Sequence, residues 1–329
     1  MSLPLNSDPR RADLVLVNPA AGGGRGARAL PLLQSFAAGK GWNADFRRTE
    51  SPEDLTLQAR AAAMEGRERI LVLGGDGTFQ VLLNALAGCP QVVLGIIPCG
   101  GGNDLAIALG LPLNPVRAAG IHLEGEARWM DAARVRTADG TGRLYTGGGG
   151  VGLDAEAAHH AGGVYRNLRG RTRYLLSAIR ALIGFHAMHM RVEIRSGNPS
   201  MLDERALVVA VLNTPSYGAG LRIAPEAQTD DGKLDLILLG DLSFLQILGV
   251  LLGLALRGEL RTKKVQRFRV EHVRIETERP CPFHGDGEMI GMTPVEIEVV
   301  PRALQILCPH RDARSRQKRE ALTFLSVNF

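Results

Sequence analysis

The chain of 329 residues has few cysteines and no Cys-x-x-Cys pair. Its four cysteines, Cys89, Cys99, Cys281 and Cys308, lie far apart, which argues against a disulfide framework and against a zinc site. A reducing cytoplasm is therefore the expected setting. The N-terminal segment lacks the apolar stretch of a signal peptide, so we expect none.

No apolar run is long enough to cross a bilayer. The longest, residues 242–256, is interrupted by Gln246, Gly249 and Gly253 and spans 15 residues. A transmembrane helix needs roughly 20. We expect a buried or interfacial helix there instead.

Lysine is scarce as well. The net charge is only +5, which is weak evidence for a nucleic-acid partner, and we predict none. Five of the 39 basic residues are lysines, and the first third of the chain holds only Lys40. A Walker-type lysine is therefore unavailable. Nucleotide phosphates would have to be held by backbone amides, arginine or metal.

What is present is an alternation of strand and helix signals between residues 13 and 135. Predicted strands cover 14–17, 43–48, 70–73 and 92–98, and predicted helices cover 27–38, 52–64, 79–86 and a segment that starts at 105. This order is typical of a doubly wound parallel sheet, in which ligands bind at the carboxyl ends of the strands. We expect residues 1–135 to form such an α/β nucleotide-binding domain.

The pattern changes after residue 136. Short strand-like runs at 192–194, 206–212, 234–239, 270–276 and 295–300 alternate with helical stretches at 168–183 and 243–256. These runs predict a second, mainly antiparallel β domain over 136–309. Residues 310–329 are basic and then apolar, and we expect a tail or helix there.

The segment 70–80 is the most informative. A buried strand stops at a glycine-rich turn, and a helical pattern follows. Glycines let backbone N–H groups approach an anion, and the helix dipole adds positive potential. Asp76 lies inside this turn and would repel a phosphate unless a metal ion or a substrate hydroxyl lies between them. The segment therefore points to phosphoryl transfer.

The loop after the first strand is ambiguous when taken alone. Gly22, Gly24 and Ala27 match a dinucleotide fingerprint, which needs an acid at the end of the second strand. Asp45 and Glu50 are near, but neither ends a clean apolar strand. A tight strand–helix turn explains the same glycines.

Taken together, the blocks resemble the diacylglycerol kinase catalytic-domain family, which comprises lipid kinases for diacylglycerol, sphingosine, ceramide and related lipids. The matching blocks are 18–23, 74–78, 98–104, 131–135, 152–156, 217–225, 231–235 and 286–288, in the family's order. Two positions depart from the pattern. Gln80 replaces the usual asparagine, and Gly101 replaces the usual threonine, whose hydroxyl would contact phosphate. We expect a modest loss of nucleotide affinity.

The resemblance implies an ATP site in a cleft between the two domains. The implied nucleotide-binding residues are Asn18, Ala20, Gly22, Thr49, Gly74, Gly75, Asp76, Gly77, Thr78, Gly101 and Asn103. Thr49 has an alternative explanation, because it also precedes the predicted helix cap Ser51.

The implied catalytic residues are Asp76, Asp286 and Glu288. A base must take the proton from the lipid hydroxyl as it attacks the γ-phosphate. Asp286 and Glu288 flank a glycine and would otherwise be read as exposed acids of a turn. The family's D-G-E motif supplies the base, and we favour Glu288 over Asp286.

Mg²⁺ is implied as a second cofactor, because it bridges phosphate oxygens in transfers from ATP. Asp76 is a candidate ligand for the catalytic ion. A structural ion is implied near Gln228, Asp231 and Lys233, with Asp131 linked to Asp231 through water. A plain turn at 231–232 explains the same residues.

A lipid kinase must reach its acceptor in a bilayer. Five arginines between 165 and 183 alternate with an apolar stripe. The tail, residues 310–329, likewise combines basic and apolar residues. Both suit an anionic membrane surface, although a solvated helix explains the first equally well. We expect a cytoplasmic protein with peripheral attachment to the inner face of the membrane. The sequence is compatible with a homodimer but does not determine the oligomeric state.

The sequence thus predicts an enzyme, a Mg²⁺-dependent lipid kinase that moves the γ-phosphoryl group of ATP to a hydroxyl of a diacylglycerol-like lipid. An NAD kinase is the alternative, although Asn84 is followed by Ala85 where that family carries glutamate. The intact Asp76, Asp286 and Glu288 argue against a catalytically silent regulator. A dehydrogenase, which the first loop alone would suggest, would not need the acids of the D-G-T and D-G-E motifs.

Overall fold

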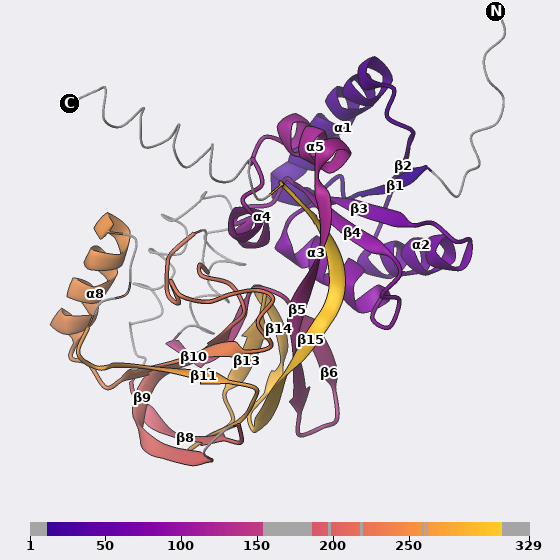
Figure 1. Ribbon diagram of the computed structural model, residues 1–329. Coiled ribbons are helices and arrows are strands. Elements are labelled where there is room, and N and C mark those ends of the chain that lie inside the picture. Colours follow the sequence, from indigo (N-terminus) through magenta and orange to yellow (C-terminus); the bar gives the residue numbers. More distant parts are fainter. Residues whose placement is uncertain are drawn as a thin grey trace, which may run out of the picture.

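The computed structural model describes residues 12–153, 186–196, 199–217, 220–257, 260 and 262–310. An α/β lobe and a β-rich lobe lie side by side (Figure 1). The predicted helix at 168–183, the arginines between 165 and 183, and residues 311–329 of the tail fall outside the described residues.

The N-terminal lobe is built on a parallel sheet. Its strands are β1 (Asp13–Val17), β2 (Ala44–Arg48), β3 (Arg69–Gly74), β4 (Val93–Pro98) and the end of β15 (Val295–Cys308), in the order β15-β4-β3-β1-β2. Its helices are α1 (Ala21–Lys40), α2 (Pro52–Met64), α3 (Asp76–Ala85), α4 (Asp104–Leu109) and α5 (Pro115–Glu124). The predicted doubly wound α/β fold is confirmed.

Both faces of β1, β3 and β4 are buried, which explains the continuous apolar runs of these strands. Leu14 and Leu16 of β1 face the cluster that contains α2 and α3. Val15 and Val17 point the other way, toward α1 and α5. Figure 1 shows α1 and α5 on one side of the sheet, with α2 and α3 on the other. Ser51 caps α2 as expected, because its Oγ accepts the Asp54 N–H at 3.1 Å.

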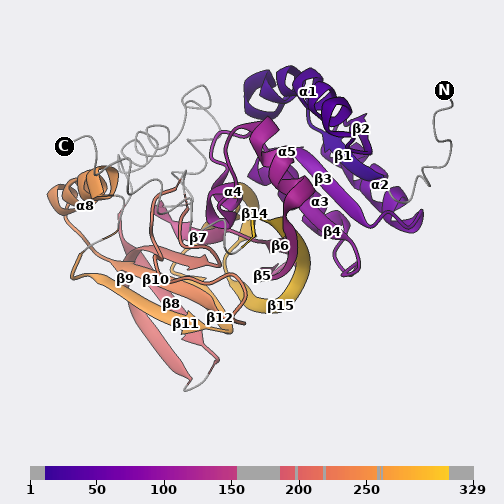
Figure 2. The same cartoon turned by 45° about the horizontal axis from the view of Figure 1, so that its top comes forward.

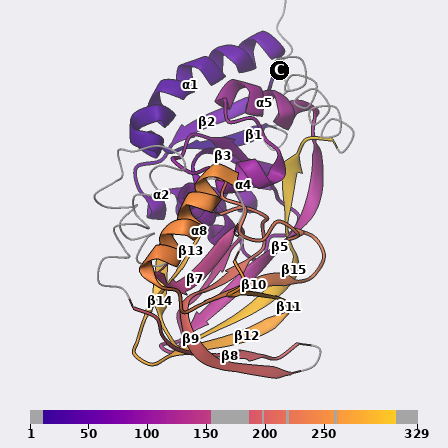
Figure 3. The ribbon, with the colours of Figure 1, turned by 90° about the vertical axis from the view of Figure 1, so that its left-hand side faces the viewer.

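The C-terminal lobe is mainly antiparallel, also as predicted. Its strands are β5 (Glu126–Thr137), β6 (Gly142–Tyr145), β7 (Gly148–Gly152), β8 (Met188–Ile194), β9 (Ser200–Leu212), β10 (Leu234–Gly240), β11 (Val265–Val270), β12 (His272–Thr277), β13 (Pro282–Gly285) and β14 (Glu288–Met292). Helix α8 (Phe244–Arg257) lies on the outside of this lobe (Figure 3). In β8, the alternate residues Met188, Met190 and Val192 enter the core of this lobe.

Strand β15 belongs to both lobes. The predicted strand at 295–300 continues to Cys308, with an irregularity between Val300 and Leu304. Its first part pairs antiparallel with β12, and its last part pairs parallel with β4. The side chains of Leu304 and Ile306 therefore complete the N-terminal core. Figure 2 shows β15 curving from one lobe into the other.

Candidate active site

Three glycine-containing loops meet at the carboxyl ends of β1, β3 and β4. Gly22 has a φ of +58°, and a methyl group there would lie 2.0 Å from the carbonyl oxygen of Cys99. A methyl group on Gly75 would lie 2.7 Å from the Cα of Gly100. These contacts leave no room for side chains, so glycine is required where the loops touch.

Side chains then fix the first loop against the second. The Asn18 amide donates to the Thr78 hydroxyl at 3.0 Å, and its oxygen accepts the Ala20 N–H at 3.1 Å. Gly74 lies directly beneath Thr78, because a methyl group there would lie 2.5 Å from the Thr78 Cβ. The structure therefore brings these four predicted nucleotide-site residues together.

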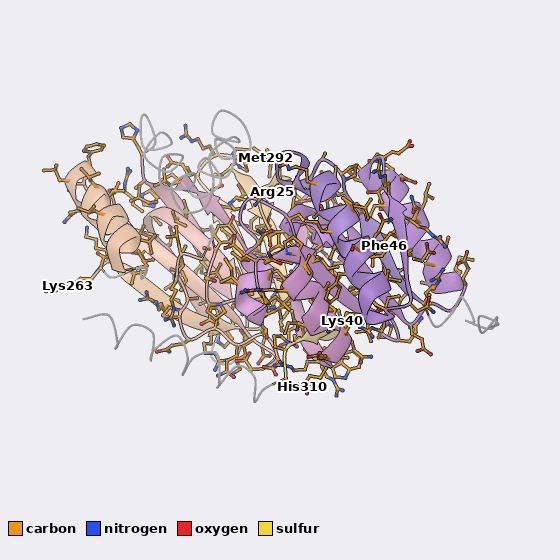
Figure 4. The ribbon with its side chains drawn as sticks, turned by 90° about the horizontal axis from the view of Figure 1, so that it is seen from above. Arg25, Lys40, Phe46, Lys263, Met292 and His310 are labelled. Carbon is orange, nitrogen blue, oxygen red and sulfur yellow. The ribbon has the colours of Figure 1, made fainter. Side chains whose placement is uncertain are left out.

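The third loop is held by its own side chain and by one arginine. Asn103, at a φ of +58°, accepts the Gly100 N–H through Oδ1 at 2.7 Å. Arg25 donates to Gly22 O at 3.2 Å and also to Gly100 O. Figure 4 labels Arg25 near the middle of the molecule, where the two lobes meet. Sequence reasoning did not single out Arg25, although it is the one basic residue of the first loop.

Thr49 and Gly101 occupy different parts of this edge. Thr49 is buried at the end of β2, and its hydroxyl donates to Val17 O at 3.1 Å. Gly101 follows Gly100 and is partly exposed in the third loop. Contact of either residue with ATP stays a prediction.

Asp76 is the first residue of α3 and also joins two of the loops. Its Oδ1 accepts the Leu105 N–H from the start of α4 at 3.1 Å. Burial raises the pKa of Asp76, while backbone N–H groups of Leu105, Asp104 and Asn103 lower it. Burial is the largest of these effects, so the carboxyl is easier to protonate than an exposed aspartate.

Asp286 lies on the other lobe, in the turn between β13 and β14. Its carboxylate accepts N–H groups from Thr146 at 2.9 Å, Gly147 at 2.8 Å and Gly148 at 3.2 Å. Burial and, to a smaller extent, the negative charge of Asp76 raise its pKa to about 6, although these hydrogen bonds lower it. The two aspartates therefore influence each other across the boundary between the lobes.

Glu288 begins β14, and its side chain reaches the signature loop. A methyl group on Gly77 would lie 2.9 Å from the Glu288 Oε1. The side chain is exposed, and no hydrogen bond to its carboxylate occurs within the described part of the chain. The structure therefore places one acid of the predicted pair against the N-terminus of α3 and uses the other to hold the turn.

A small hollow lies between Asp76 and Asp286 and is lined by residues of both lobes. Its lining residues are Asp76, Asp104, Leu105, Gly147, Tyr217, Asp286 and Gly287. Asp104 and Tyr217 were not among the predicted site residues. Asp104 ends the third glycine block and accepts the Gly220 N–H at 2.8 Å. Its position in that block was the feature of the sequence that could have identified Asp104 as a site residue.

Helix α3 also bonds directly to the C-terminal lobe. The buried Gln80 amide donates to Gly285 O at 2.9 Å, one residue before Asp286. One turn later, the Asn84 amide exchanges two hydrogen bonds of 2.9 Å with the backbone of Leu144. The departure from the family pattern at Gln80 therefore lies at a contact between the two halves of the site.

The residues implied for a structural ion have other partners. Both oxygens of Asp131 accept backbone N–H groups, from Gly232 at 2.7 Å and from Arg302 at 2.8 Å. Asp231 accepts the Lys233 N–H at 3.0 Å and pairs with Arg269. A turn thus accounts for these contacts without an ion. Gln228 is exposed nearby in sequence, and a metal here stays a prediction.

Comparison with known proteins decides the family. Residues 13–135 match the model of the diacylglycerol kinase catalytic domain, and residues 147–308 match that of the YegS C-terminal NAD kinase beta sandwich-like domain. A diacylglycerol kinase from Mycobacterium tuberculosis is 32% identical over 259 residues, which cover 76% of this chain and 79% of that protein. The chain belongs to the diacylglycerol kinase family.

Other relatives agree with this assignment. A diacylglycerol kinase from Bacillus subtilis is 26% identical over 285 residues, covering 86% of this kinase and 91% of that protein. A crystal structure of a diacylglycerol kinase from Bacillus anthracis has a TM-score of 0.72 at 24% identity, covering 91% of this chain and 98% of that one. Yeast NADH kinase in complex with NADH has a TM-score of 0.52 at 11% identity, covering 95% and 88%. Both structures show the same fold, and the family makes this protein a phosphotransferase of the lipid kinase type.

Proposed function

We propose that this kinase transfers the γ-phosphoryl group of ATP to a hydroxyl of a diacylglycerol-like membrane lipid. One observation carries the proposal: the Glu288 carboxylate lies against Gly77, in the first turn of α3. A candidate base from one lobe therefore meets candidate phosphate-binding amides from the other. A reaction between a hydroxyl and a phosphate needs these two groups in one site.

Phosphates would bind along the glycine loops of the N-terminal lobe. The first N–H groups of α3 have no partner within the helix and give its N-terminus a positive potential. The glycines at positions 22, 75 and 100 keep the loop backbones close together. Arg25 adds a positive charge between the first and third loops. Backbone amides and arginine thus replace the missing lysine.

Glu288 would act as the general base. It would accept the proton of the lipid hydroxyl while that oxygen attacks the γ-phosphorus, and ADP would leave. Asp286 would act differently, because its oxygens accept three backbone N–H groups. It holds the β13–β14 turn, and so it sets where Glu288 points.

Mg²⁺ fits this arrangement as a partner of the phosphates. Asp76 and Asp104 line one hollow beside the phosphate-binding loops. Within the described residues, no three acids, histidines or cysteines are grouped so that they would hold a metal by themselves. Protein-bound Mg²⁺ commonly uses one or two carboxylates plus substrate phosphates, which is the set available here. When bound, the ion would neutralise charge on the transferring phosphoryl group.

Phosphate transfer from labelled ATP to a panel of acceptors tests the proposal. The panel contains diacylglycerol, sphingosine, ceramide and NAD, with and without Mg²⁺. We expect label on a lipid when Mg²⁺ is present, and a much lower but measurable amount of label with the Asp76→Asn variant. Label on NAD and on no lipid would overturn the proposal in favour of the NAD kinase alternative.

A further inference from the structure

Helix α8 presents apolar side chains on two sides. Ile247 and Leu254 are buried against the β domain, and Val250 packs beside them. On the other side, Phe244 is 59% exposed, Leu245 77%, Leu248 42% and Leu252 57%. We call these four residues the outer face of α8. Solvent-exposed apolar groups of this kind mark an interaction surface.

Before its last residue, Arg257, the helix has no charged side chain to keep this face in water. Residues 244–256 contain only apolar residues, glycine and Gln246. The outer-face residues Leu245, Leu248 and Leu252 recur every three or four positions, which aligns them along one side of a helix. Within the described chain no helix is long and apolar enough to span a membrane. The outer face is therefore suited to lie on an apolar partner, and not to cross one.

The charge around α8 favours an anionic partner. Lys263 and Lys264 follow the helix and are exposed, and Figure 4 shows Lys263 at the same end of the molecule as α8. The acid that precedes the helix, Asp241, is paired with Arg205 at 3.6 Å. Its carbonyl also accepts the Lys264 ammonium at 2.7 Å. The surroundings of the outer face are thus positive.

The size of the outer face favours a bilayer over a second protein. A stable protein interface takes roughly 20 to 30 residues from each partner, whereas the described side chains of this face include four exposed apolar residues. A bilayer needs only a few apolar side chains in its headgroup region and basic residues beside them. The inner side of α8 also shares a cluster with Tyr217, which lines the carboxylate hollow. A membrane at the outer face would therefore lie on the far side of a helix that packs near the site.

We propose that Phe244, Leu245, Leu248 and Leu252 insert into the headgroup region of an anionic membrane, with Lys263 and Lys264 against lipid phosphates. The choice of a lipid surface rests in part on the proposed function. The binding itself does not depend on turnover and is tested without it.

Co-sedimentation of the full chain with vesicles measures the binding. The vesicles contain phosphatidylcholine alone or with phosphatidylglycerol. Two exposed leucines of α8 are changed together in the variant Leu245→Gln with Leu248→Gln. The matched control changes Leu32→Gln with Leu57→Gln, which are 61% and 68% exposed on the N-terminal lobe. We expect the α8 variant to bind at least about tenfold more weakly, and the control to bind like wild type.

Lys263→Gln tests the charge separately. One basic residue near an anionic surface contributes about a fivefold change in binding. We expect that loss on vesicles with phosphatidylglycerol and no change on phosphatidylcholine alone. Unchanged binding of the α8 variant, or no binding by the wild type, would overturn the proposal. A lower molecular mass of the variant in sedimentation, with vesicle binding unchanged, would identify a dimer interface instead.

A water-soluble short-chain diacylglycerol separates this proposal from the proposed function. The α8 variant should phosphorylate it at the wild-type rate in the absence of vesicles, because the outer face does not line the site. If no lipid is phosphorylated by either protein while the variant still loses vesicle binding, the membrane surface stands and the proposed function fails.

Discussion

The two sides of the site are built in opposite ways. On the N-terminal side, the groups that would grip phosphates are backbone amides of loops that directly follow buried strands. On the C-terminal side, the candidate catalytic groups are carboxylates on one turn, and Asp286 is fixed by N–H groups about 140 residues earlier in the chain. The first side is local in sequence. The second exists only when the β domain has folded.

Two specific contacts of helix α3 join the sides close to the candidate catalytic groups. Gln80 reaches across 205 positions of sequence to Gly285, and Gly77 touches Glu288. Because both contacts come from α3, one helix carries the signature loop and supports the acidic turn. Substitutions on each side should therefore affect different steps of the reaction, and substitutions at the contact should affect their alignment.

The largest effect is expected from Glu288→Gln. Removing a general base lowers the rate by about 10²- to 10⁴-fold, and we expect this loss in kcat with little change in the KM for ATP. Labelled phosphate transfer measures both constants. Glu271→Gln, at an exposed position of the same lobe, is the control and should match wild type. A kcat for Glu288→Gln within twofold of wild type would exclude the residue as the base.

Next in size is Gly22→Ala, which tests the other side. Its methyl group would collide with Cys99 O, so the loops must separate. We expect ATP binding to weaken by roughly 10- to 100-fold, measured by titration calorimetry, with a smaller effect on kcat. Gly23→Ala is the matched control, because Gly23 also has a positive φ but nothing within 4 Å of a new methyl group. Equal losses in the two variants would show that backbone strain, and not loop contact, is responsible.

Gln80→Asn tests the contact between the sides. The shorter side chain falls one methylene short of Gly285 O and leaves a buried carbonyl unpaired, at a cost of about 1 to 3 kcal/mol in the free energy of unfolding. We expect kcat to fall by roughly 3- to 10-fold with the KM for ATP unchanged. Urea unfolding measures the stability. Gln80→Glu keeps the length and removes the donor, so it should be at least as damaging. A normal kcat in both variants would make the bond purely structural.

The smallest expected effect is on the pH profile. Because the pKa of Asp286 is raised to about 6, its carboxylate gains a proton as the pH falls through that value. A neutral carboxyl accepts N–H groups more weakly, so the turn loosens and kcat should fall on the acid side. The negative charge of Asp76 contributes to the raised pKa. Asp76→Asn should therefore move the acid limb of its residual activity to lower pH, by less than about one unit.

Asp104→Asn provides the comparison for this shift. Asp104 lines the same hollow, but it is not among the causes of the raised pKa of Asp286. Its substitution should leave the position of the acid limb unchanged, whatever it does to the rate. If the acid limb moved by the same amount in both variants, its position would depend on the total charge in the hollow and not on the interaction between Asp76 and Asp286.

Several elements of the fold were readable from the sequence because their signals are local. The helix 52–64 was predicted from its serine cap and proline, and it has those bounds in the structure. Strands β1, β3 and β4 were visible as apolar runs because both faces of a parallel sheet are buried. Helix α5 was not predicted. The run 270–276 proved to contain the end of β11 and most of β12, since residue 271 separates two strands of similar composition.

What the amino-acid sequence determined by itself is the chemistry of each half: glycine loops that suit phosphates, and acids that suit a hydroxyl. Each of these features depends on a few consecutive residues, so it can be recognised from a short segment of the sequence. Only the tertiary structure decided that Glu288 meets Gly77, that Gln80 holds Gly285 and that β15 returns to complete the first sheet. These contacts join residues more than 200 positions apart along the chain, and the packing and register of long strands bring them together.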